Sequence, residues 1–326
     1  MASNAAEVWQ DARVVETIPL TPRIRRIVLE PARPIPVAAG SHVDVRVRIQ
    51  HATDRRSYSV VDASRDGARV AISVFDSAAS RGGAAFMHGL EPGDHVEITQ
   101  PLLTFPLRIG APRYLLLAGG IGITALAGMA TTLSAVGADY RLVYAGRARE
   151  GMAYLDELSQ QHGDRLETRI SDEGSPLAVT ELVATVDEST ELYMCGPIRL
   201  MDAVRRAWIE RELPLPNLRF ETFGNSGWFD AQEFVVRIPA QGIEVAVQPD
   251  QTMLEALEAA GADMMFDCRK GECGLCEVRV IQLEGDIDHR DVFYSERQKD
   301  ARSKLCCCVS RVVARSGPAL VEIQSS

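Results

Sequence analysis

The sequence contains the stretch Asp267-Cys268-Arg269-Lys270-Gly271-Glu272-Cys273-Gly274-Leu275-Cys276, in which three cysteines have the spacing C-x4-C-x2-C. A triplet, Cys306, Cys307 and Cys308, follows later in the chain. Thiolates are metal ligands, and the glycines within the stretch allow a tight loop whose backbone amides point at the sulfurs. The stretch therefore predicts a metal-binding loop that a later cysteine completes.

A 2Fe-2S cluster explains this spacing best, because plant-type clusters use three close cysteines and one distant cysteine. A zinc site more often has paired C-x2-C arms, and packed free cysteines need no fixed spacing. Both alternatives stay open at this point. We expect Cys268, Cys273 and Cys276 to bind iron, and the spacing alone leaves Cys306 and Cys308 as candidates for the fourth ligand.

Length and charge limit the possible functions. A chain of 326 residues can form two or three domains. The net charge of -10 argues against a nucleic-acid partner, because phosphate binding needs a basic face. Six of the seven cysteines follow residue 267, and residues 1–7 contain no signal peptide, which together predict a reducing cytoplasm.

One apolar stretch is long enough to cross a membrane. Residues 114–138 contain no charged side chain. The stretch includes five glycines, however, and these favour a buried strand, a glycine turn and a helix. We therefore expect no membrane association.

Residues 8–107 have the pattern of antiparallel strands. Residues 24–29 and 42–49 are short or alternating apolar runs separated by prolines and glycines, which predicts a small barrel. Within it, Arg56-Ser57-Tyr58-Ser59 places an arginine and an aromatic ring on the same face of a strand, where they suit a phosphate and a planar ring. Ser80-Arg81-Gly82-Gly83-Ala84 adds a glycine loop that can hold phosphate at a helix start. Each motif alone also fits an ordinary surface arginine or turn.

Residues 108–224 alternate between strand and helix patterns. Residues 114–118 form a continuous apolar run that leads into Gly119-Gly120-Ile121-Gly122-Ile123-Thr124 and a helix. Further strands are expected at 140–145, 166–170 and 191–194, with helices at 152–160 and 198–211. This order predicts a parallel sheet, with ligands at the carboxyl ends of the strands. Both the glycine turn and Cys195-Gly196-Pro197 fall at such ends, although no acidic residue completes a standard Rossmann motif and Cys195 could simply be packed.

The last part of the chain predicts a small α+β domain. Residues 225–232 form a linker, and a hairpin is expected from the strands at 233–238 and 243–247. Thr252 and Glu255 form a capping box for a helix that Gly261 ends. A hairpin, a helix and a cysteine loop in this order suit a β-grasp ferredoxin.

With these motifs in this order, the chain resembles the phthalate dioxygenase reductase family, which includes vanillate demethylase reductases and reductase domains fused to some cytochromes P450. The resemblance implies a multidomain fold: an antiparallel β-barrel flavin domain at 1–107, an α/β parallel-sheet nicotinamide domain at 108–224, and an α+β β-grasp ferredoxin domain at 233–326. It also implies the cofactors FMN, NADH and a 2Fe-2S cluster.

The resemblance assigns site residues to each cofactor. It implies that FMN contacts Arg56, Ser57, Tyr58, Ser59, Gly82, Gly83, Ala84, Thr124 and Phe223. Ala84 stands where the family commonly has serine, so one hydroxyl contact is missing. For the nicotinamide nucleotide it implies Gly119, Gly120, Gly122, Asp172, Cys195, Gly196 and Pro197, with Cys195 and Thr124 nearest the reacting rings. Asp172 lies where an acid discourages a 2'-phosphate, which favours NADH. Family-like residues at 288–291 and 308–311 favour Cys308 as the fourth cluster ligand.

The implied function is that of an oxygenase reductase. A hydride passes from NADH to FMN, and single electrons then pass through the cluster to a terminal oxygenase. We expect a Rieske non-haem iron oxygenase acting on an aromatic acid or ether, with the reductase as a monomer. Three alternatives stay open: a reductase for a separate cytochrome P450, a free flavin or ferric reductase, and a non-enzymatic zinc-binding protein.

Overall fold

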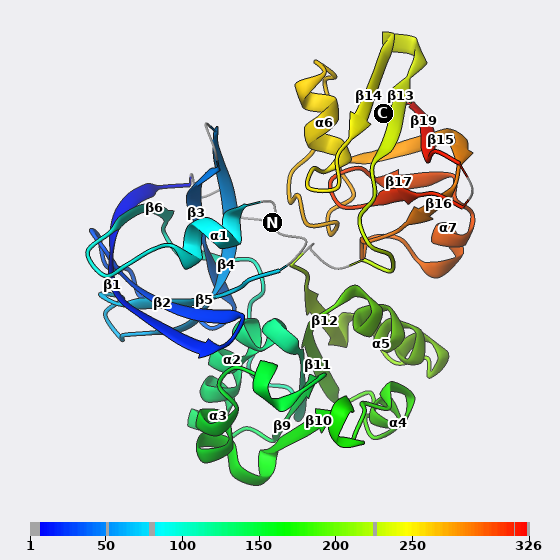
Figure 1. Cartoon of the computed structure of the whole chain (residues 1–326). Helices are drawn as coiled ribbons and strands as arrows, with labels where there is room; N and C mark the ends of the chain where they lie inside the picture. Colours follow the sequence, from blue (N-terminus) through cyan, green and yellow to red (C-terminus); the bar gives the residue numbers. More distant parts are fainter. Residues whose placement is uncertain (1–6, 50–51, 78–81, 224–226, 316, 325–326) are drawn as a thin grey trace. The chain divides into compact units, whose positions relative to one another are not determined.

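The computed structural model describes residues 7–49, 52–77, 82–223, 227–315 and 317–324. The chain forms two compact units (Figure 1). The first comprises Met1–Gly196 with Ala203–Glu221, and the second comprises Pro197–Asp202 with Thr222–Ser326.

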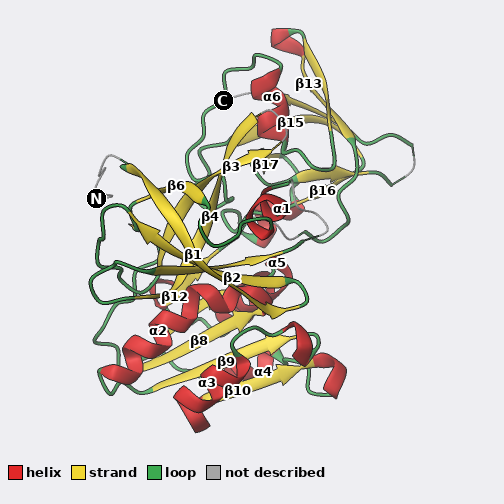
Figure 2. Cartoon of the chain, turned by 60° about the vertical axis from the view of Figure 1, so that its left-hand side comes forward, coloured by secondary structure: helices red, strands yellow, loops and turns green. Residues whose placement is uncertain are grey.

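The first unit begins with an antiparallel barrel. Its strands are β1 (Trp9–Thr21), β2 (Ile24–Pro31), β3 (Ser41–Ile49), β4 (Ala52–Ala63), β5 (Val70–Phe75), β6 (His95–Thr99) and β7 (Leu102–Leu103). They are ordered β4-β5-β2-β1-β6-β3-β7, and pairing of β3 with β4 closes the barrel (Figure 2). Side chains along β3 alternate between the barrel interior and its surface. Val43, Val45 and Val47 are fully buried, whereas Arg46 and Arg48 are exposed. Helix α1 (Gly83–His88) packs against β3 and β5.

A parallel sheet follows in the same unit. Its strands are β8 (Arg113–Gly119), β9 (Tyr140–Gly146), β10 (Leu166–Ile170), β11 (Thr190–Cys195) and β12 (Leu218–Glu221), in the order β10-β9-β8-β11-β12. The helices are α2 (Ile123–Ala135), α3 (Leu155–His162), α4 (Val179–Ala184) and α5 (Ile198–Glu210). The expected helix at residue 152 begins three residues later, because Tyr154 has a left-handed φ of 64°.

The apolar stretch 114–138 belongs to this sheet. It forms β8, the glycine turn and α2, and α2 packs across β8, β9 and β11. Within the described ranges, none of the helices combines the length and hydropathy that a bilayer crossing requires.

The barrel and the parallel sheet are joined by buried contacts. Helix α2 contacts barrel strand β4. The Ser59 hydroxyl of β4 donates to the Glu221 carboxylate of β12 over 3.0 Å, and the Ser73 hydroxyl lies 2.5 Å from the Tyr154 hydroxyl. Because all four side chains are buried, these contacts fix the two sheets as parts of one unit.

The second unit is built on a mixed sheet. Its strands are β13 (Phe234–Ile238), β14 (Ile243–Val247), β15 (Glu277–Glu284), β17 (Lys304–Cys306) and β19 (Leu320–Gln324), ordered β14-β13-β19-β15-β17. Strands β16 (Asp286–Asp288) and β18 (Arg311–Val313) pair separately, and the helices are α6 (Met253–Ala259) and α7 (Glu296–Asp300). The predicted capping box is present at α6: Thr252 and Glu255 exchange both hydrogen bonds, at 3.1 and 2.8 Å. Of the predicted linker, Asn225 and Ser226 lie outside the described residues.

The expected fold class is confirmed, since the chain contains an antiparallel barrel, a parallel α/β sheet and a small mixed-sheet domain that carries the cysteines.

Candidate functional site

The cysteine loop, residues 267–276, directs backbone amides at one sulfur. The amides of Lys270, Glu272 and Cys273 each donate to Cys268 Sγ over 3.4 Å. The Cys308 thiol also hydrogen-bonds to this sulfur, and it and the three amides lower the pKa of Cys268 to about 4. Donors converging on a sulfur favour the thiolate, which is the form that binds iron. The loop therefore fits a metal cluster in its electrostatics.

The downstream cysteines lie beside the loop, and their contacts differ. The Cys276 and Cys308 sulfurs lie 3.1 Å apart, and Cys308 interacts with Cys268 as well. Cys306 ends strand β17 and interacts with Cys276. Hydrogen bonding with Cys306, Cys307 and Cys308 lowers the pKa of Cys276. Cys308 is thus in contact with two of the three loop cysteines.

Two glycines of the loop have no room for a side chain. Gly271 has a φ of 75°, and a Cβ there would lie 2.7 Å from Val309 Cγ2 and 2.9 Å from Asp291 Cα. Gly274 has a φ of 74°, and its Cβ would lie 2.3 Å from the Phe293 ring. Positive φ and close packing both require glycine at these positions. The loop shape is therefore set by contacts with residues 291–293 and 309.

Thr222 is a contact of this loop that the sequence did not reveal. It directly follows β12 and is buried at 3% exposure. Its amide donates to Glu272 Oε1 over 2.8 Å, and its hydroxyl donates to the Lys270 carbonyl over 2.8 Å and to Glu272 Oε1 at 3.2 Å. Burial raises the pKa of the Glu272 carboxyl. Nearly fifty residues separate Thr222 from the loop, so no local pattern indicates this contact.

The two predicted flavin motifs meet in the barrel. A Cβ on Gly83, at the start of α1, would lie 2.9 Å from Arg56 Nε of β4. The arginine of the R-x-Y-S motif therefore lies directly over the glycine loop, as a phosphate site requires. Arg56 also donates to Asp54 Oδ2 over 2.6 Å, so a phosphate there would compete with Asp54. Of the predicted phosphate loop, Ser80 and Arg81 lie outside the described residues.

The remaining barrel residues have different surroundings. Tyr58 is half-buried, and burial raises the pKa of its hydroxyl. The Ser57 hydroxyl donates to the buried Asp44 carboxylate, and the Ser59 hydroxyl donates to Glu221. The hydroxyls of both serines that were predicted to contact FMN therefore donate to carboxylates of the protein. Ala84 is buried within α1.

The glycine turn and the C-G-P segment are brought together in the parallel sheet. A Cβ on Gly122 would lie 2.2 Å from the Cys195 carbonyl oxygen and 2.9 Å from the Gly196 nitrogen. Gly122 is thus required by packing of the turn against the end of β11. Gly120 has a φ of 55°, and a Cβ there would meet no atom within 4 Å, which leaves open space at the turn. Only Gly120 of these two glycines leaves room for a ligand.

The groups expected nearest the reacting rings are buried. The Cys195 side chain is fully buried, and that of Thr124 is 2% exposed. The Thr124 hydroxyl donates to the Ile121 carbonyl over 2.9 Å, which closes the glycine turn onto α2. Gly119 ends β8, Pro197 directly precedes α5, and Phe223 is half-buried.

Asp172 lies directly after β10 and is exposed. Its amide donates to the Arg147 carbonyl over 2.9 Å, and its carboxylate lies 3.7 Å from Arg147 Nε. The Arg147 side chain is 90% exposed. The sequence reasoning missed this arginine, which directly follows β9 and lies beside the predicted nucleotide residue Asp172.

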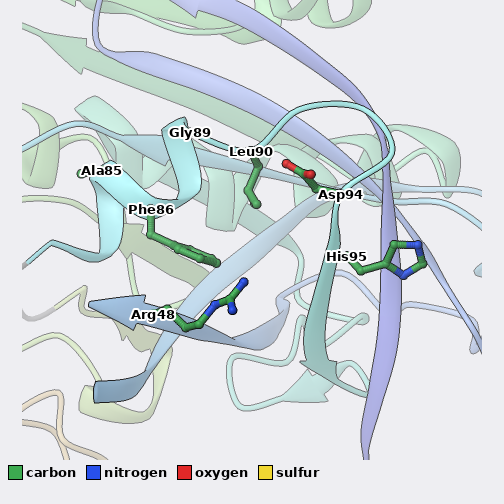
Figure 3. A pocket seen from close by; sticks show the side chains of 7 residues that line it. All are labelled: Arg48, Ala85, Phe86, Gly89, Leu90, Asp94 and His95. Atoms are coloured by element: carbon green, nitrogen blue, oxygen red, sulfur yellow. The ribbon is translucent and has the colours of Figure 1, made fainter. Parts of the chain in front are cut away.

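One surface hollow lies next to the glycine loop of the barrel, on residues that follow that loop. It has a volume of about 570 Å³ and lies over β3 and α1 (Figure 3). Its lining residues are Arg48, Ala85, Phe86, Gly89, Leu90, Asp94 and His95. It includes neither Arg56 nor Gly83, so it is distinct from the predicted flavin cradle.

Comparisons with known proteins agree with this arrangement. Residues 236–313 match the model of the 2Fe-2S iron-sulfur cluster binding domain. The chain is 33% identical over 296 residues to the carnitine monooxygenase reductase subunit of Acinetobacter pittii (strain PHEA-2), covering 90% of this chain and 96% of that protein.

Solved structures extend the likeness to the whole chain. The structure of phthalate dioxygenase reductase, described as modular for electron transfer from pyridine nucleotides to [2Fe-2S], matches with a TM-score of 0.70 and 28% identity. This match covers 96% of this chain and 98% of that one. An intact type IV self-sufficient cytochrome P450 monooxygenase matches with a TM-score of 0.65 and 33% identity over 97% of this chain, which spans 41% of that protein.

Relatives of matching length include reductase subunits of oxygenase systems, and the structure of phthalate dioxygenase reductase covers nearly the whole chain. The chain therefore belongs to the phthalate dioxygenase reductase family, whose members bind FMN, NADH and a 2Fe-2S cluster.

Proposed function

We propose that this chain is the NADH-dependent reductase of a multicomponent oxygenase and that its terminal partner is a Rieske non-haem iron enzyme. One observation carries the proposal: three amides and the Cys308 thiol converge on Cys268 in a chain whose first unit packs a glycine turn against Cys195-Gly196. A zinc-binding protein without enzymatic activity would have no use for that first unit.

The barrel residues would hold the flavin. Arg56 lies over Gly83 and would neutralise the phosphate together with the amides that follow Gly82. Tyr58, two residues along the same strand, would lie against the ring. When bound, FMN accepts two electrons as a hydride from NADH and the 2Fe-2S cluster carries electrons singly.

The parallel sheet would bind the nucleotide. Open space at Gly120 suits the pyrophosphate, and the packing of Gly122 on Cys195 brings the C-G-P segment to the same end of the sheet. Because the Cys195 side chain is fully buried, a nicotinamide ring could reach it only if the segment moved. Asp172, close to Arg147, disfavours a 2'-phosphate and so favours NADH.

The second unit would hold the cluster on Cys268, Cys273, Cys276 and Cys308. Contact of Cys308 with both Cys268 and Cys276 supports it over Cys306 as the fourth ligand. The amides on Cys268 would stabilise negative charge on the cluster sulfurs.

Membership of the family implies an oxygenase partner, and we propose the class of that oxygenase. The resemblance to vanillate demethylase reductases supports a Rieske oxygenase acting on an aromatic acid or ether. The likeness to a self-sufficient cytochrome P450 makes a separate P450 the second candidate. The clustering of the cysteines in one domain supports the cytoplasm as the compartment, and we propose a monomer.

An absorption spectrum tests the proposal. The purified protein should show flavin bands together with the broad visible absorption of a 2Fe-2S cluster, and NADH should bleach both. A colourless protein that retains zinc would contradict the proposal. Electron delivery to a Rieske oxygenase and to a P450, measured side by side, then decides the partner.

A further inference from the structure

Thr222 contacts the cysteine loop with all of its polar groups except its carbonyl. The amide and the hydroxyl make three hydrogen bonds to Lys270 and Glu272, with lengths of 2.8, 2.8 and 3.2 Å. At 3% exposure the residue is shielded from water, so these bonds have little competition from solvent.

The two residues that Thr222 holds are the ones whose amides bind Cys268. Lys270 and Glu272 each donate to Cys268 Sγ over 3.4 Å, and Cys273 follows with a third bond of the same length. Thr222 therefore binds the Lys270 carbonyl and the Glu272 carboxylate of this segment, while Cys268 receives amides of the same segment.

Between Lys270 and Glu272 the backbone is restrained by residues from outside the loop. Gly271 has no side chain and adopts a φ of 75°. Its carbonyl accepts from the Val292 amide over 3.0 Å, which restrains the middle of the segment. Thr222 supplies a restraint on either side of Gly271, because it binds the Lys270 carbonyl and the Glu272 carboxylate, and both of these residues also donate their amides to Cys268.

We infer that Thr222 is a positioning residue for the iron-sulfur site, which keeps the amides of residues 270–273 on the Cys268 sulfur and thereby raises the reduction potential of the bound cluster. Amide hydrogen bonds to cluster sulfurs stabilise the extra negative charge of the reduced state, and their loss shifts the potential downward. The inference rests on the proposed function in one respect, namely that Cys268 is a cluster ligand.

The test is the variant Thr222→Val, which keeps the amide and the side-chain shape and removes the hydroxyl. We expect its cluster potential, from a redox titration followed by electron paramagnetic resonance, to be more negative than that of wild type, with NADH reduction of the flavin unchanged. Thr222→Ser should restore the wild-type potential. Thr185→Val is a matched control, because the Thr185 hydroxyl donates to the Leu182 carbonyl over 2.7 Å after α4, in the other unit.

A second measurement uses the protein without its cluster. In Thr222→Val the amides of residues 270, 272 and 273 should exchange with solvent faster than in wild type, while those of β19 exchange at the wild-type rate. An unchanged potential in a loaded Thr222→Val protein would overturn the inference, and so would unchanged exchange in a variant that fails to load. Absence of iron from wild type would contradict the proposed function, whereas the exchange experiment would still decide the role of Thr222.

Discussion

The glycine turn at residues 119–122 and the cysteine loop at residues 267–276 are both predicted to bind a cofactor, but they are packed differently. In the turn, Gly122 packs on the Cys195 backbone while the space beside Gly120 is open. In the loop, Gly271 and Gly274 are both packed against neighbouring residues, and Thr222 holds the loop from a third side. A nucleotide has to enter and leave its site, whereas a cluster stays bound. Open space beside the turn suits a ligand that exchanges, and close packing around the loop suits a ligand that stays bound.

The largest effect is expected from a variant that disrupts the cysteine loop and leaves the glycine turn intact. Cys308→Ser should abolish the visible absorption of the cluster, because Cys308 contacts two loop cysteines. NADH-dependent reduction of ferricyanide, which the flavin can perform, should continue.

The matched control for that variant is Cys306→Ser, which alters a neighbouring buried thiol. It should retain most of the cluster absorption. Greater cluster loss in Cys306→Ser than in Cys308→Ser would show that the fourth ligand has been assigned wrongly.

Gly122→Ala breaks the turn and should leave the loop intact. Its Cβ would lie 2.2 Å from the Cys195 carbonyl oxygen. The Cβ is fixed to the backbone of the turn and the oxygen belongs to the backbone of β11, so the clash can be relieved only if the turn or β11 moves. We expect a loss of about 3 kcal/mol in stability and slow flavin reduction by NADH, with cluster absorption preserved. Thermal unfolding and stopped-flow absorbance measure the two effects.

Gly120→Ala, in the same turn, should cost less stability than Gly122→Ala. Its cost is limited to the left-handed φ of 55°, about 1 to 2 kcal/mol, because the space beside it is open. Equal unfolding temperatures for the two alanine variants would contradict the distinction between a packed glycine and an open one.

Asp172→Ala tests nucleotide choice at the edge of the parallel sheet. Removal of the carboxylate leaves Arg147, whose side chain is 90% exposed, available to a 2'-phosphate. We expect the KM for NADPH to fall by about tenfold or less, since one exposed ion pair contributes about 1 kcal/mol. The KM for NADH should change little. Steady-state ferricyanide reduction with each nucleotide provides the measurement, and an unchanged NADPH preference would remove Asp172 from the specificity site.

The smallest expected effect is a pH dependence confined to the first unit. His162 is buried beside Tyr140, and burial lowers its pKa. Because the unfolded histidine has the higher pKa, near 6.5, the unfolded state binds the proton more readily and stability falls as pH drops below that value. Unfolding of the first unit should therefore shift to lower temperature between pH 7.5 and 5.5, and His162→Phe should reduce that slope. A slope equal to that of wild type in the variant would assign the effect to another group.

Local patterns were sufficient for much of the fold. Alternation identified β3, the apolar run identified β8, and Thr252 with Glu255 identified the start of α6. These features depend on residues that are close in sequence. The start of α3 was placed too early, since the left-handed conformation of Tyr154 has no signal in its residue type.

The candidate site was predictable in its residue types and less so in its contacts. Spacing identified the loop cysteines, whereas the contacts of Cys308, the hold of Thr222 on Glu272 and the bond from Ser59 to Glu221 join residues far apart in sequence. Such contacts depend on the order of the strands in the sheets, and this order cannot be read from local patterns in a single sequence. The packing of Gly122 on the Cys195 carbonyl oxygen is a further contact of this kind, because the two residues are far apart in sequence.

Strand β19 has a consequence for biosynthesis. It lies in the middle of the second sheet, parallel to β13 and antiparallel to β15, although it is the last strand in sequence. The barrel and parallel sheet can fold while the ribosome is still translating, because their strands are complete by residue 221. The second sheet cannot close until residues 320–324 have been made, because β19 joins β13 to β15, whereas β15 and β17, which carry the cysteines toward one another, pair directly. A nascent chain that ends before residue 320 would therefore carry a complete barrel and parallel sheet but a second sheet still divided between β13 and β15.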